Sequence, residues 1–205
     1  MKGIVSFGGY IPKQRLDRMA IYQGMGWFAP AIVMVAQGER SFCNWDEDAV
    51  TMAVAAGRDS LVGLDKGAID SVVLASTTLP FQDRSNAGLV KTALNLPDAI
   101  PVLDVTGTLR AGTQALINSL ETVGDGGRKR VLVMASDKRE TKAATFYEMW
   151  FGDGAASVVL GVGEDVVAEF LGSHTVSHDF VDHYRGTGHS FDYNWEERWA
   201  RDEGY

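Results

Sequence analysis

Threonine hydroxyls gather between Asp104 and Thr113, the stretch of the sequence best placed for chemistry. This stretch joins a predicted strand over residues 100–105 to a predicted helix over 109–123. The unpaired N–H groups and the dipole of a helix N-terminus stabilise negative charge beside such a turn. Neither Thr106 nor Thr108 has a base near it in the sequence, and an unactivated hydroxyl is a poor nucleophile. On spacing alone, a plain strand-to-helix turn is the favoured interpretation.

Two further stretches carry residue types that can bind ligands or metals. The turn Gly152-Asp153-Gly154 precedes a small-residue strand, but no Lys-Ser/Thr follows it, which excludes a phosphate loop. Imidazole and carboxylate groups between residues 174 and 189 would suit zinc or iron, yet their spacing matches no ligand set, so we expect surface histidines and no metal. These residues are His174, His178, Asp179, Asp182, His183 and His189.

Cys43 is the only cysteine of the chain. A single cysteine excludes an internal disulfide framework and a thiolate-cluster metal site, and it fits a reducing, cytoplasmic location. Because Cys43 lies just before a predicted helix cap, an activated thiolate is one interpretation. An inert, packed thiol is the favoured one.

Alternating strands and helices must position these residues. Asn44 and Glu47 form a capping-box pattern before an amphipathic helix that extends to Leu61. Continuous apolar runs predict strands covered on both faces, and helices follow the first two of them, so parallel strands with right-handed crossovers are expected. The strands are predicted over 69–75, 100–105 and 130–135, and the helices over 86–94 and 109–123.

The ends of the chain depart from this alternation. Residues 4–7 predict a short strand that ends in a turn at Gly8-Gly9. Strands over 155–162 and 166–170 have only three residues between them and are predicted to pair as a hairpin. Residues 24–44 suit a loop, a short helix or a surface that packs on a partner. Beyond Gly172 the apolar periodicity ends, so this tail cannot build its own core.

Composition limits the classes of partner. The 205 residues are 45% hydrophobic and 22% charged, which is typical of a globular protein. Nineteen Lys and Arg against 27 Asp and Glu give a net charge of −8, the wrong sign for a nucleic-acid backbone. The most apolar run, Trp27 to Ala36, is half the length of a membrane span, and Met1 to Val5 lack a signal-peptide pattern. We therefore expect no nucleic-acid or membrane partner.

Several segments, in this order, resemble the thiolase superfamily, and within it the 3-hydroxy-3-methylglutaryl-CoA synthases and the ketoacyl-ACP synthases that initiate fatty-acid synthesis. The resemblance covers residues 3 to about 170. Its most specific parts are the motifs at 44–53 and 151–156. The matching stretches are Gly3-Ile4-Val5, Gly9-Tyr10-Ile11-Pro12, Asn44 to Ala53, Ile69-Asp70, Asp104 to Thr113 and Phe151 to Ala156.

The resemblance implies the fold of this chain. It predicts an α/β, thiolase-like layered fold with one mixed, mostly parallel sheet and helices on both faces, which is half of the usual two-lobed fold. Residues 1–172 are predicted to form this N-terminal domain. Residues 173–205, including Asp182-His183-Tyr184-Arg185, resemble the start of the missing second half.

The resemblance also implies a chemistry, the condensation of acyl thioesters, with coenzyme A or acyl-pantetheine as substrate and no cofactor. Leu109 falls where the family carries its acyl-accepting cysteine, next to Thr108, and Thr77 falls where hydroxymethylglutaryl-CoA synthases carry a catalytic glutamate. A leucine cannot form a thioester. Trp27 and Arg40 occupy the N-terminal region that contacts coenzyme A in this family, although a paired surface arginine is an equal interpretation of Arg40.

Two functions follow from these departures. The chain is a condensing acyltransferase that is incomplete alone, or a non-catalytic subunit that pairs with an active homologue or a separate C-terminal half; a truncated fragment is a third possibility. Partners implied are acyl-CoA or acyl carrier protein, a thiolase-like chain as homo- or hetero-oligomer, and a zinc-ribbon acyl-CoA-binding protein. Candidate contact surfaces, with ordinary core as the equal alternative, are residues 27–36 and Phe191, Tyr193, Trp195 and Trp199.

Overall fold

The computed structural model describes residues 1–124, 127–178 and 184–193. The chain divides into two compact units. The first unit contains Met1–Arg15, Ser41–Lys138 and Gly152–Gly172. The second contains Leu16–Arg40, Arg139–Phe151 and Ser173–Tyr205, and the expected boundary at residue 172 stays a prediction.

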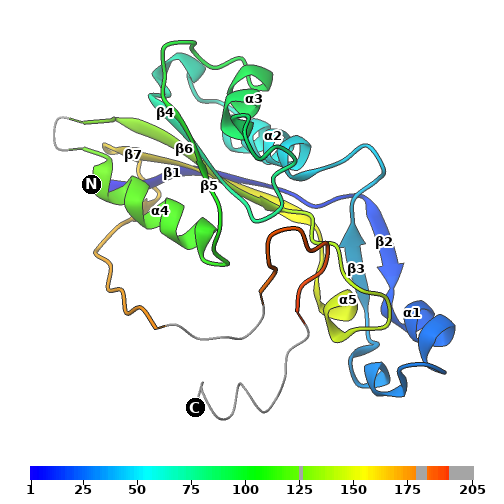
Figure 1. Cartoon of the computed structure of the whole chain (residues 1–205). Coiled ribbons are helices and arrows are strands. Elements are labelled where there is room, and N and C mark those ends of the chain that lie inside the picture. Colours follow the sequence, from blue (N-terminus) through cyan, green and yellow to red (C-terminus); the bar gives the residue numbers. More distant parts are fainter. Residues whose placement is uncertain (125–126, 179–183, 194–205) are drawn as a thin grey trace. The chain divides into compact units, whose positions relative to one another are not determined.

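A six-stranded mixed sheet forms the centre of the first unit, in the order β5-β4-β6-β7-β1-β8 (Figure 1). Strand β4 pairs in parallel with β5 and β6, whereas β6–β7, β7–β1 and β1–β8 are antiparallel. Four strands therefore run in one direction and β7 and β8 in the other, which confirms the predicted mixed sheet. The strands are β1 (Lys2–Tyr10), β4 (Ser71–Ala75), β5 (Val102–Val105), β6 (Arg130–Asp137), β7 (Gly154–Val162) and β8 (Ala168–Glu169).

Helices cover both faces of this sheet, because successive residues of a strand point to opposite faces and both sets are apolar. Leu74 and Met134 pack in the core cluster with residues of α2 (Ala49–Ser60) and α3 (Asn86–Ala93). Their neighbours Val73 and Val133 pack instead with Ala111 and Ala115 of α4 (Ala111–Thr122). In Figure 1, α4 lies on one side of the sheet and α2 and α3 on the other.

The predicted turn at Gly8-Gly9 is wrong, because β1 continues through both glycines to Tyr10. A Cβ atom at Gly8 would lie 2.4 Å from the backbone nitrogen of Ser60 and 2.7 Å from the carbonyl oxygen of Ala56. Glycine is therefore required because helix α2 approaches the strand closely, and not because the chain turns.

The predicted hairpin of residues 155–162 and 166–170 is also wrong. Strands β7 and β8 each pair with β1, which lies between them. The turn after β7 passes the start of β1, where the N–H of Gly163 donates to the carbonyl of Met1 at 3.0 Å. Because β1 comes from the other end of the sequence, local spacing gave no sign of this insertion.

Helix α2 begins four residues later than the Asn44 pattern predicts, with Asp48 rather than Asn44 as its N-cap. Its capping box is formed by Asp48 and Thr51, each side chain accepting the other residue's backbone N–H at 2.7 Å. Glu47 instead accepts from the backbone N–H of Asn44 at 2.7 Å and remains outside the helix. Two capping patterns overlap here, and the structure uses the second.

Strand β5 is an edge strand rather than one covered on both faces. It pairs only with β4, and the side chain of Leu103 is 56% exposed. The apolar run in the sequence therefore indicated the strand correctly but not its place at the edge.

The short η2 helix (Lys66–Ala68) precedes β4.

The second unit is built from short elements that the sequence did not reveal. Its apolar core contains Ile21, Ile32, Ala36 and Met149. The guanidinium of Arg18 ties the backbone together by donating to the carbonyls of Gln37, Glu39 and Met149. Three of the short elements lie wholly in this unit, namely α1 (Arg18–Met25), η1 (Pro30–Val35) and α5 (Phe146–Trp150). The paired strands β2 (Gln14–Asp17) and β3 (Glu39–Phe42) each have residues in both units. Residues 24–44, for which three interpretations were open, thus contain a short helix and a strand.

No helix within the described residues is long and apolar enough to span a lipid bilayer.

Candidate functional site

The carboxyl ends of β1, β4, β5 and β6 share one edge of the sheet, because these four strands run in the same direction. The register sets Ala75 beside both Val105 and Ala135. The residues that follow these positions therefore meet at this edge, which is where open α/β sheets bind ligands. They include Thr77, the β5–α4 corner (residues 106–110) and Asp137.

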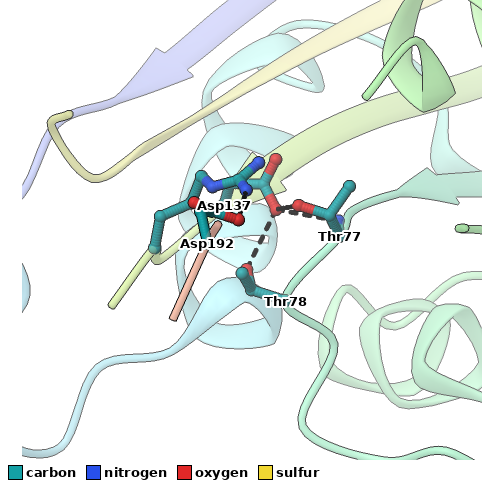
Figure 2. Close-up of polar contacts among 5 residues, drawn as sticks. Thr77, Thr78, Asp137 and Asp192 are labelled. Carbon is teal, nitrogen blue, oxygen red and sulfur yellow. Dashed lines mark hydrogen bonds and ion pairs between the residues drawn. The ribbon is translucent and has the colours of Figure 1, made fainter. Parts of the chain in front are cut away.

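One carboxylate oxygen of Asp137 accepts several hydrogen bonds from the loop after β4 (Figure 2). Its Oδ1 accepts from the N–H and the hydroxyl of Thr77 at 2.8 and 3.0 Å, from the Thr78 hydroxyl at 3.0 Å and from the Ser76 hydroxyl at 3.1 Å. We call these four residues the Asp137 clamp. The hydroxyl of Thr77 donates to a carboxylate and has no acidic proton of its own to transfer at neutral pH, so its geometry suits positioning rather than acid catalysis.

The β5–α4 corner presents an aliphatic side chain at a helix start. Leu109 is 50% exposed, and helix α4 begins two residues later without a side-chain cap. Gly107 has a left-handed φ of +82°, and the Thr108 hydroxyl accepts from the N–H of Arg110 at 3.2 Å. The structure thus places Thr108 and Leu109 at the predicted strand-to-helix turn. The dipole of α4 favours negative charge at this turn, but Leu109 offers no nucleophile.

The Gly-Asp-Gly turn holds Cys43 in the interior of the first unit. The Asp153 carboxylate, itself buried, accepts the N–H of Cys43 at 2.7 Å, and the Ser41 hydroxyl donates to the Asp153 carbonyl at 2.7 Å. The Cys43 sulfur lies 3.5 Å from that of Met52. Burial, followed by the charge of Asp153, raises the pKa of the Cys43 thiol to about 12. The thiol is therefore protonated at neutral pH. This agrees with the interpretation of Cys43 as an inert, packed residue.

Sequence reasoning missed a polar cluster at the end of β1. The hydroxyl of Tyr10 donates to the carboxylate of Glu47, and this hydrogen bond raises the pKa of Tyr10 and lowers that of Glu47. Lys138, which follows Asp137, donates to the Glu47 carbonyl at 2.8 Å. Glu47 belongs to the motif at 44–53, where its spacing from Asn44 is also that of a helix cap.

Trp27 and Arg40, the predicted coenzyme A contacts, lie in the second unit. Trp27 is 82% exposed and touches Phe28 edge to face, with 5.8 Å between ring centroids. Arg40 is half-buried and donates from Nη1 to the Glu148 carbonyl at 2.8 Å. Arg40 therefore supports helix α5 whatever else it does.

Among the residues that the structure describes, no three His, Cys, Asp or Glu side chains are grouped as metal ligands. His174, His178 and His189 are exposed. Asp179, Asp182, His183, Trp195 and Trp199 lie outside the described residues.

Comparison with proteins of known sequence identifies hydroxymethylglutaryl-CoA synthases as relatives. The synthase of Pyrobaculum aerophilum is 29% identical over 189 residues, which cover 91% of this chain and 54% of that protein. That of Caldivirga maquilingensis is 28% identical over 186 residues, covering 89% and 53%. The chain spans about half the length of the curated relatives it matches. No protein-family model matches it.

Solved structures show the same fold. A crystal structure of HMG-CoA synthase complexed with CoA superposes with a TM-score of 0.83 at 21% identity, over 98% of this chain and 52% of that one. The priming β-ketosynthase of the R1128 polyketide pathway gives 0.70 at 23% identity, over 80% and 51%. The thiolase-like layered fold is thereby confirmed, as is the resemblance to hydroxymethylglutaryl-CoA synthases and initiating ketoacyl synthases. The chain is thus similar in sequence to hydroxymethylglutaryl-CoA synthases and has the fold of thiolase-like proteins.

Proposed function

We propose that this chain binds acyl thioesters as part of a thiolase-like condensing assembly and forms no acyl-enzyme at its own β5–α4 corner. The observation that carries the proposal is the identity of Leu109, whose aliphatic side chain is exposed at the start of α4. The one thiol of the chain, on Cys43, is buried and has a raised pKa, so it does not replace the missing nucleophile.

Restoring a thiol at the corner tests this proposal. Leu109→Cys should become acylated by acetyl-CoA, because the N-terminus of α4 favours the thiolate. Leu103→Cys is the matched control, since Leu103 is 56% exposed against 50% for Leu109 but lies within a strand. Intact-protein mass spectrometry should find an acetyl adduct on Leu109→Cys at least about tenfold more abundant than on Leu103→Cys, and none on the wild type. Acylation of the wild type, or equal acylation of both variants, would refute the proposal.

Trp27 and Arg40 are the proposed coenzyme A contacts, with the indole for stacking on the base and the guanidinium for a phosphate. Thr77 and Thr108 are proposed to position the acyl group at the carboxyl edge of the sheet. The exposure of Trp27 and the fixed hydrogen bonds of Thr77 support these roles.

Calorimetry with free coenzyme A tests the Arg40 contact. Arg40→Ala should weaken binding about five- to tenfold by removing a charge-assisted hydrogen bond. Arg58→Ala, which removes an exposed arginine of α2, controls for net charge. Because Arg40 also supports α5, thermal unfolding of each variant must show that it is folded at the titration temperature. An unchanged affinity would remove Arg40 from the site.

A non-catalytic subunit is the second candidate. Large apolar side chains are exposed on β1 and just after it, namely Phe7 at 73% and Ile11 at 64%, and an exposed apolar surface of this kind favours association with another chain. The same titration separates the two candidates, since a purely structural subunit should bind no coenzyme A before any substitution is made.

A further inference from the structure

A buried ion pair holds the C-terminal segment within the second unit. Arg139 donates from Nη2 to Oδ1 of Asp192. The side chains are only 13% and 2% exposed. The second carboxylate oxygen of Asp192 is buried and has no hydrogen-bond partner among the described residues. Arg139 therefore supplies the main compensation for a charge that would be costly to bury unpaired.

The guanidinium of Arg139 also lies against an aromatic ring. The guanidinium carbon lies 5.1 Å from the centroid of the Phe151 ring, a cation–π distance. That ring stacks on Tyr147 at 5.2 Å, with 11° between the planes. A planar guanidinium held against a ring presents its N–H groups in a set direction, which suits recognition of a carboxylate.

The segment from Tyr184 to Tyr193, which we call the strap, leaves its aromatic side chains only partly buried. It closes on itself, because the N–H of Tyr193 donates to the Tyr184 carbonyl at 2.8 Å and the two rings stack at 5.0 Å. Yet Tyr184, Phe191 and Tyr193 remain 46%, 40% and 56% exposed. Asp192 is the one buried residue within this segment. A charged group thus takes the anchoring role that an apolar side chain has in most docked segments.

We propose that Arg139, stacked on Phe151, is a built-in carboxylate receptor, and that Asp192 occupies it to fasten the strap to the second unit. The ion pair sets whether the strap is docked, while the core of the unit, formed around Ile21, Ile32 and Met149, does not depend on it. Removing the carboxylate takes away the charge-assisted hydrogen bond that joins the strap to Arg139, so docking should be lost.

Hydrogen exchange of the full chain tests the fastening. In Asp192→Asn, which keeps the shape and removes the charge, the amide of Tyr193 should exchange about tenfold faster or more. Amides of β4 and β6 should keep their wild-type rates. Asp98→Asn is the control, because it neutralises an exposed carboxylate paired with Lys91. Unchanged exchange at Tyr193, or faster exchange throughout the sheet, would overturn the proposal.

Chemical rescue tests the receptor. Asp192→Ala removes the carboxylate from Arg139, and acetate can bind to the guanidinium in its place and allow the strap to dock again. Protection of the Tyr193 amide should return in sodium acetate and not in sodium chloride of the same ionic strength. An equal response to both salts, or no response to acetate, would show that the site does not recognise a carboxylate.

Discussion

Cys43 shows how its surroundings decide what a reactive residue type can do. Its backbone N–H is held by Asp153, and its sulfur lies against Met52. Burial removes the water that would stabilise a thiolate, and the neighbouring carboxylate adds repulsion. The same Asp153 that organises the Gly-Asp-Gly turn therefore also keeps the thiol protonated.

The reactivity of Cys43 toward a disulfide reagent should follow from this pKa. At pH 8 a thiol with a pKa of about 12 is about one part in ten thousand thiolate, so the folded protein should react far more slowly than the chain unfolded in urea. The pKa of Cys43 is higher in the folded protein than in the unfolded chain, where it is near 8.5. The contribution of the protonated thiol to the free energy of unfolding is therefore complete below about pH 8.5 and is lost as the pH rises toward 12. Cys43→Ala should lack this alkaline loss in urea unfolding at several pH values. Equal rates for folded and unfolded chains would contradict the assignment.

Between elements, a carboxylate of one strand caps a neighbouring helix. Asp104, on β5, accepts the N–H groups of Asn86 and Ala87 at 2.8 and 2.6 Å, which caps α3 from a neighbouring strand. The buried side chain of Asn86 also donates to the carbonyl of Phe81 at 2.9 Å. This network fixes the loop between the Asp137 clamp and α3.

Removing the Asp104 carboxylate should therefore destabilise the first unit. Asp104→Ala loses a cap that serves two N–H groups, and we expect the free energy of unfolding to fall by about 1–2 kcal/mol. Asp98→Ala, which breaks an exposed pair with Lys91, should change stability little. Urea unfolding followed by far-UV circular dichroism measures both. Equal effects of the two substitutions would show that Asp104 does not act as a cap.

At the scale of the whole molecule, the fold shows which features this chain shares with the condensing enzymes that it resembles. The six-stranded sheet and its helices on both faces carry the corner, the Asp137 clamp and the Tyr10–Glu47 pair at one edge. The chain matches about half of each relative. The side chain at the corner is the departure that a second chain would have to compensate.

The sequence by itself determined the order and type of the central elements, since the apolar alternation of a strand and the 3.6-residue repeat of a helix are local patterns. It also determined that position 109 is a leucine and that the chain has one thiol. Only the tertiary structure decided that β1 separates β7 from β8, that Gly8 serves a helix contact, and that Asp137 gathers three hydroxyls. These features depend on residues far apart in the chain, whose pairing is selected by burial and hydrogen bonding in the folded state and leaves no periodic trace in the sequence.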